Sequence, residues 1–215
     1  MINTVIFDLD GVLVSTDELH YLAWKRLAEE LNITGFTKAD NERQRGVSRM
    51  ESLEVVLEKS DKAYTQEEKL KLAEKKNDYY KESLRDVDES IILPGAIKTL
   101  KLLHERGVKV GVGSASKNTP AILEKTGLAG LIDKVSCGLD TDKSKPEPDV
   151  FLIAAKKLES DPENCLVVED SAAGIEAAKR ANMKSLGVGP FNKTLGASIC
   201  AENLADNLNW DEILK

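Results

Sequence analysis

The chain has 215 residues, of which 41% are hydrophobic and 31% charged, a composition typical of a folded globular protein. Acidic residues outnumber basic ones by 37 to 30, and the net charge of -7 argues against broad nucleic-acid binding, which needs a basic face. No apolar run is long enough to span a membrane, the N-terminus lacks the basic start of a signal peptide, and the three cysteines lie far apart. We therefore expect a cytoplasmic protein without nucleic-acid or membrane partners.

The hydrophobic pattern changes twice along the chain. A short β-branched run at residues 4–7 predicts a buried strand. From Asp17 to about Leu84 apolar residues recur at helical spacing without a β-rich run, which predicts a helical insert. After Pro94 helices alternate with strands. The predicted helices cover residues 97–106, 120–126, 149–158 and 172–182, and the predicted strands cover residues 108–113, 134–137, 166–168 and 186–188.

This alternation predicts an α/β fold with a doubly wound, Rossmann-like parallel sheet that helices cover on both faces. The core would comprise residues 1–14 and 94–215. The helical insert, residues 15–93, would form a separate cap.

Charged and hydroxyl side chains follow the predicted strands. They are Asp8, Asp10, Ser114, Glu169 and Asp170, with Lys145 in a loop before a helix. In open α/β sheets ligands bind beyond the carboxyl ends of the strands, so these groups are expected to converge. Two unit charges about 4 Å apart interact by about 4 kcal/mol at an effective dielectric constant near 20, so converging carboxylates need positive charge beside them. Lys145 supplies one charge, and a divalent cation with oxygen ligands, by default Mg²⁺, would supply the rest.

Four motifs in order resemble those of the haloacid dehalogenase superfamily of phosphotransferases. They are Asp8-Leu9-Asp10-Gly11-Val12, Ser114-Ala115-Ser116, Lys145-Pro146-Glu147-Pro148 and Glu169-Asp170-Ser171. One Asp-x-Asp motif is weak evidence, but four motifs that each follow a predicted strand or precede a helix are specific.

Within that superfamily, essentially the whole chain resembles the β-phosphoglucomutase family. The similar stretches are Ala23-Trp24-Lys25, Arg45 to Leu53, Lys75 to Asp78 and Ser114 to Asn118. The resemblance implies that Asp8 is a nucleophile that becomes an aspartyl phosphate and that Asp10 is the general acid and base. Ser114 and Lys145 would hold the oxygens of the phosphoryl group being transferred.

The same resemblance implies the ligand sites. Mg²⁺ would be held by Asp8, the Asp10 carbonyl and Asp170, with Glu169 at the edge or bound through water. The substrate-binding residues would fall into two groups. The phosphate that does not react would be bound by Arg49, Ser116, Lys117 and Asn118. The sugar pocket would be lined by His20, Trp24, Arg45, Ser52 and Lys76, and Gly46, Val47 and Ala115 lie in the same stretches of sequence.

Two residues depart from the family pattern, and several have a simpler explanation. Ser15 stands where such proteins commonly carry Asp, and Arg45 replaces the usual Lys. Arg49 could instead be a surface residue paired with Glu54, and Trp24 could be part of the hydrophobic core of the cap. Two further residues have structural alternatives that stay open at this point: His20 as a half-buried helix residue and Lys76 as a solvated one.

The activity implied by the resemblance is the interconversion of β-glucose 1-phosphate and glucose 6-phosphate through a 1,6-bisphosphate, in a monomer with small sugar phosphates as partners. A sugar-phosphate phosphatase of the same superfamily is the main alternative. A non-catalytic binding protein is a third possibility, and the intact set of Asp8, Asp10, Lys145 and Asp170 argues against it.

Overall fold

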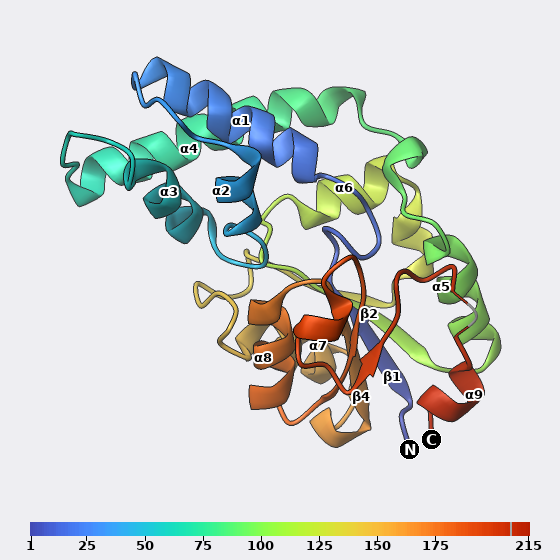
Figure 1. Ribbon diagram of the computed structural model, residues 1–215. Coiled ribbons are helices and arrows are strands. Elements are labelled where there is room, and N and C mark those ends of the chain that lie inside the picture. Colours follow the sequence, from blue (N-terminus) through green and yellow to red (C-terminus); the bar gives the residue numbers. More distant parts are fainter. Residues whose placement is uncertain (207) are drawn as a thin grey trace.

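The computed structural model describes residues 1–206 and 208–215 and contains a parallel six-stranded sheet in the order β3-β2-β1-β4-β5-β6 (Figure 1). The strands are β1 (Thr4–Phe7), β2 (Lys109–Gly113), β3 (Lys134–Ser136), β4 (Cys165–Glu169), β5 (Lys184–Gly187) and β6 (Ile199–Cys200). All five strand pairs are parallel. The predicted doubly wound α/β fold is confirmed.

Helices cover both faces of the sheet because its buried side chains alternate. Val5 and Phe7 of β1 pack with α5 (Ala96–Glu105) and α6 (Thr119–Lys125), whereas Ile6 packs with α7 (Asp149–Lys157) and with alanines of the helix that follows β4. That helix is α8 (Ala172–Arg180), and α9 (Trp210–Ile213) ends the chain beside the first strand. Among the described residues, no helix is both long and apolar enough to cross a membrane.

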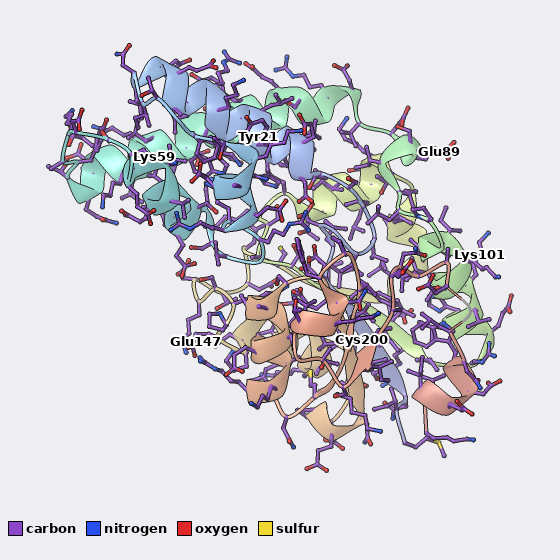
Figure 2. All side chains as sticks on the ribbon, in the orientation of Figure 1. Tyr21, Lys59, Glu89, Lys101, Glu147 and Cys200 are labelled. Carbon is purple, nitrogen blue, oxygen red and sulfur yellow. The ribbon has the colours of Figure 1, made fainter. Side chains whose placement is uncertain are left out.

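Four helices form a second layer over one end of the sheet (Figure 1). They are α1 (Asp17–Glu30), α2 (Lys38–Glu42), α3 (Arg49–Leu57) and α4 (Gln66–Ser83). They share a hydrophobic cluster of their own, centred on Trp24, Leu27 and Leu53. This separate cluster supports the proposed division into a cap and a core. In Figure 2 the exposed Lys59 lies on the cap, and Cys200 lies on the core.

Two elements differ from the sequence prediction. The strand expected last, at residues 186–188, lies at Lys184–Gly187 and is followed by β6, whose two residues are too few to give an alternating pattern. Helix α2 was not predicted because its five residues, four of them charged or polar and one alanine, carry no apolar stripe. A capping box between Thr37 and Asp40 starts it instead. Short 3-10 turns lie at Leu84–Asp86, Glu89–Ile91, Leu128–Leu131, Pro162–Asn164 and Asn192–Thr194.

The strand order places one crevice at the middle of the sheet. Strands β2 and β3 lie on one side of β1, and β4, β5 and β6 lie on the other, so the direction of winding reverses between β1 and β4. Ligands of doubly wound folds bind beyond the strand ends at such a switch point. The residues that follow β1 and β4 are Asp8 and Asp170, on the side that the cap covers.

The junction between β4 and α8 holds the Glu169 side chain rigidly. Its Oε2 accepts hydrogen bonds from the backbone N–H groups of Asp170 and Ser171 at 2.9 and 2.8 Å and from the Ser171 hydroxyl at 2.8 Å. A Cβ atom on Gly174, in the first turn of α8, would overlap this carboxylate. Gly174 is therefore required by close packing and not by backbone conformation.

We predict that Gly174→Ala destabilises the protein by about 2 kcal/mol, the scale of overpacking in a filled core, although alanine normally favours a helix over glycine. Gly130→Ala is the matched control, because nothing lies within 4 Å of the added Cβ. Urea unfolding of both variants measures the effect. Equal stability of Gly174→Ala and the wild type would contradict the close packing described above.

Candidate active site

A cavity of about 390 Å³ lies between the cap and the carboxyl ends of the strands. Every residue that the sequence analysis proposed for the site lines it, except Glu169, which is fully buried behind it. The structure therefore brings together side chains from the cap and from four loops of the core. Their individual roles remain proposals.

A buried lysine links the ends of β1 and β4. Lys145 Nζ donates to Asp8 Oδ1 and to Glu169 Oε1, at 2.6 Å in both cases, and its side chain is 0% exposed. Burial lowers the pKa of Lys145, but the two carboxylates more than reverse this and raise it. The lysine stays charged and holds Asp8 in place at the carboxyl end of β1.

The charge of Lys145 does not fully compensate the negative charge around Asp8. Burial raises the Asp8 pKa to about 7; Lys145 opposes the shift, while Glu169 and Asp10 add to it. A carboxylate with this environment gains a proton near neutral pH unless another cation or donor faces it.

Asp10 is held by the segment that enters the cap. The Thr16 hydroxyl donates to Asp10 Oδ1, and burial raises the Asp10 pKa to about 6 despite that hydrogen bond. A carboxyl group with a pKa near 6 can both donate and accept a proton close to neutral pH, as general acid-base catalysis requires.

Asp170 contacts the cap directly. Arg45 Nη1 donates to Asp170 Oδ2 at 2.7 Å, and the same guanidinium pairs with Asp17 at 2.5 Å and with Glu42 at 2.8 Å. Burial raises the Asp170 pKa to about 8, and Glu169 and Asp8 add to this more than Arg45 reduces it. The centre of the site therefore carries an excess of buried negative charge.

The donor set at this point fits a Mg²⁺ ion. Within the described residues, no group of three or more His, Cys, Asp or Glu side chains is placed to hold a metal ion by itself. Mg²⁺, however, usually takes only one or two carboxylates and completes its shell with water and substrate phosphate. Asp8 and Asp170 are oxygen donors with raised pKa values, so a cation would relieve their repulsion. Gly11 leaves room for them, because a Cβ there would overlap Asp170.

Lys76 lies in the cap wall of the cavity and is not solvated. Its side chain is 2% exposed, and Nζ lies 2.7 Å from His20 Nδ1 and 4.6 Å from the centre of the Trp24 ring. Burial, followed by the charge of Arg49, holds the Lys76 pKa well below its usual value; burial and Lys76 do the same for the His20 pKa. His20 is therefore neutral, and one hydrogen bond joins its Nδ1 to Lys76 Nζ. Trp24 both lines the cavity and belongs to the hydrophobic cluster of the cap.

Arg49 faces the cavity but pairs with a different acid from the one expected. Its Nη1 donates to Glu74 Oε2 at 3.0 Å, whereas Glu54 pairs with Lys69. The surface pairing of Arg49 with Glu54, considered above as an alternative, is therefore wrong. Across the cavity, Asn118 of the core donates to Asn77 of the cap at 3.0 Å.

Sequence reasoning missed several residues of the cavity wall. They are chiefly Asp17, Glu74, Asn77 and the loop at residues 141–144. Ser144 of that loop donates to Glu51 of the cap at 2.5 Å. Glu74 follows Arg49 by more than twenty residues in a charge-rich helix, so no local pattern marks it. Asn77 lies in the stretch Lys75 to Asp78 that resembles the family, but it was given no role there. Asp17 was visible as an acid in the first turn of a helix, where acids are common for another reason.

A doubly wound sheet with carboxylates, a hydroxyl group and a buried lysine beyond its strands, covered by a helical cap, defines a class of phosphoryl-transferring enzymes. Residues 2–182 match the model of the haloacid dehalogenase-like hydrolase family. The chain belongs to this family.

Individual relatives agree with this family. The chain is 39% identical to the β-phosphoglucomutase of Bacillus subtilis over 94% of its own length and 90% of the relative's. A crystal structure of β-phosphoglucomutase from Clostridium difficile superposes on this chain with a TM-score of 0.92 and is 38% identical to it in sequence. The superposition covers 99% of this chain and 96% of the Clostridium difficile chain. A phosphorylated-carbohydrate phosphatase of Thermotoga maritima is 29% identical over 85% of the chain and 82% of its own length.

The lowered pKa of Lys76 predicts a pH-dependent effect of Lys76→Met on stability. At pH values between the pKa of Lys76 in the folded protein and its usual value of 10.5, the unfolded chain binds more protons than the native protein. Lys76 therefore lowers the free energy of unfolding at neutral pH, and this loss becomes smaller as the pH rises. We expect the melting temperature of Lys76→Met to exceed that of the wild type at pH 7.5 and the difference to shrink by pH 9.5. Lys75→Met, an exposed neighbour, is the control. A difference that does not change with pH would contradict the prediction.

Proposed function

We propose that this protein is a Mg²⁺-dependent phosphomutase that interconverts β-glucose 1-phosphate and glucose 6-phosphate through an aspartyl phosphate on Asp8 and a 1,6-bisphosphate. The observation that supports the proposal is that side chains able to hold phosphate lie on two opposite sides of one cavity. Asp8, Ser114 and Lys145 lie at its floor, and Arg49 lies on its cap side. A mutase needs both sets, because each end of the bisphosphate must in turn occupy the reacting position.

The first half of the reaction transfers a phosphoryl group. An Asp8 oxygen bonds to phosphorus while the bond from phosphorus to the departing sugar oxygen breaks. Asp10 gives its proton to that oxygen, and Lys145 and Ser114 hold the phosphoryl oxygens. Mg²⁺, bound by Asp8, the Asp10 carbonyl and Asp170, would neutralise charge on the phosphoryl group. Because both carboxylate oxygens of Glu169 already accept hydrogen bonds inside the protein, we assign it to the positioning of Lys145 and not to the metal.

When the bisphosphate has given its C1 phosphoryl group to Asp8, glucose 6-phosphate departs. The second half reverses these steps with the 6-hydroxyl of an incoming β-glucose 1-phosphate, and the bisphosphate forms again. Asp10 takes the proton of the attacking hydroxyl, and the phosphoryl group leaves Asp8. Water must not reach the aspartyl phosphate in the meantime, and the cap over the cavity provides this exclusion. The buried Lys76 and its half-buried partner His20 would meet the sugar at the cap wall.

The direct test is the turnover of β-glucose 1-phosphate with Mg²⁺ and a catalytic amount of the bisphosphate. We expect glucose 6-phosphate to form faster than free phosphate, and a chelator to abolish turnover until Mg²⁺ is restored. Asp8→Asn should abolish both turnover and the phosphoenzyme, whereas Asp10→Asn should slow turnover by about 10²–10⁴-fold. Mass spectrometry locates the phosphorylated residue. Faster release of free phosphate would favour the alternative, a sugar-phosphate phosphatase.

Arg49→Ala separates transfer between two ends of a sugar from simple hydrolysis. We expect kcat/KM for the mutase reaction to fall at least about tenfold, the loss of one charge-assisted hydrogen bond to phosphate. Hydrolysis of acetyl phosphate, which has no second phosphate, should change far less. Arg43→Ala is the matched control, because Arg43 pairs with Glu58 on the surface of the same cap. If both activities of Arg49→Ala fall equally, Arg49 has a structural role only.

A further inference from the structure

Arg45 joins the cap to the core through an oxygen that the proposed metal site needs. It lies in the turn between α2 and α3, and its side chain is 21% exposed. One guanidinium nitrogen donates to Asp170 Oδ2 at 2.7 Å. Asp170 is the residue after β4 and belongs to the core, whereas Arg45 belongs to the cap.

The other two partners of Arg45 lie on the cap with it. Asp17 begins α1 and accepts from Nη2 at 2.5 Å, and Glu42 ends α2 and lies 2.8 Å from Nε. A movement of the cap away from the core would therefore break only the contact with Asp170. The guanidinium would keep two carboxylates beside it, so leaving Asp170 does not strand a buried charge.

We propose that Arg45 is a tethered counter-cation for Asp170: it ties the cap to the core in the metal-free protein, and Mg²⁺ binding displaces it onto Asp17 and Glu42. The inference rests on the proposed Mg²⁺ site. A guanidinium and a metal ion at one carboxylate repel each other, and Asp170 Oδ2 is already occupied by the guanidinium. The ion with the greater charge replaces the tethered one, and the Arg45 contact between cap and core is lost with it.

This displacement gives metal binding a structural consequence before any sugar arrives. A core without metal keeps the Arg45 contact with its cap. A core with metal holds the cap through fewer contacts, such as those of Asn77 with Asn118 and of Glu51 with Ser144, so the cap moves more readily to admit the sugar phosphate. Linkage requires the reverse as well: whatever removes the Arg45 contact strengthens Mg²⁺ binding by the same factor by which Mg²⁺ weakens the contact.

The first measurement is the affinity for Mg²⁺ alone, by calorimetry without substrate. We expect Arg45→Met to bind Mg²⁺ at least about fivefold more tightly than the wild type. Arg43→Met, which removes the same charge from the surface of the cap, should leave the affinity within about twofold. Arg45→Lys is the second variant, in case the neutral one folds poorly, because one ammonium cannot reproduce the fork that joins Asp170 to Asp17. It should also bind Mg²⁺ more tightly.

The second measurement is the distance between cap and core without substrate. Spin labels on cysteines that replace the exposed Lys71 and Lys179, with Cys200 changed to Ser, report it. In the wild type Mg²⁺ should lengthen or broaden the distance distribution relative to the chelator. In Arg45→Met the distribution should already be broad in the chelator and should change little with Mg²⁺.

The outcomes separate this inference from the proposed function. If the wild type binds Mg²⁺ but both Arg45 variants bind it equally or more weakly, the counter-cation role is wrong and the Mg²⁺ site stands. If affinity rises in Arg45→Met but the wild-type cap does not respond to Mg²⁺, Arg45 acts through space only and the displacement is wrong. If no variant binds Mg²⁺ at millimolar concentration, both proposals fail.

Discussion

The whole site depends on one buried ammonium group, that of Lys145, shared between Asp8 and Glu169. A charge at 0% exposure is tolerated only when it is paired and hydrogen-bonded, and removal of one partner would leave an uncompensated ion in the interior. The turn before α8 makes this possible, because the N–H groups of Asp170 and Ser171 and the Ser171 hydroxyl fix Glu169, which in turn fixes the lysine. The position of Asp8 follows from that chain of contacts.

The cap supplies what the sheet alone lacks. The floor of the cavity holds acids and one lysine, whereas the cap contributes Arg45, Arg49 and the hydrogen-bonded pair of Lys76 and His20. Each cap arginine already has a carboxylate partner, Asp17 for the first and Glu74 for the second. The cations that a phosphorylated ligand would meet are therefore held in place in advance by acids of the same layer, which reduces the side-chain entropy lost on binding.

The cavity also explains why its pKa values lie where they do. Asp8 and Asp170 are buried close to other carboxylates, so burial and repulsion act in the same direction and raise both. Lys76 is buried without an acid beside it, so burial lowers its pKa. The pKa values of the acids and of the lysine shift in opposite directions, and burial between the cap and the sheet contributes to both shifts. The excess negative charge lies on the sheet side of the cavity.

The sequence by itself determined the α/β fold and the positions of Asp8, Ser114 and Asp170, because each follows a short apolar strand and parallel strands end at one edge of the sheet. It could not determine which distant charges meet. Arg49 pairs with Glu74 and not with Glu54, which is nearer in sequence. Arg45 pairs with Asp170, which is 125 residues away in sequence. These partners lie on different elements, and only the packing of the cap helices on each other and on the core decides which of many similar acids comes within hydrogen-bond distance.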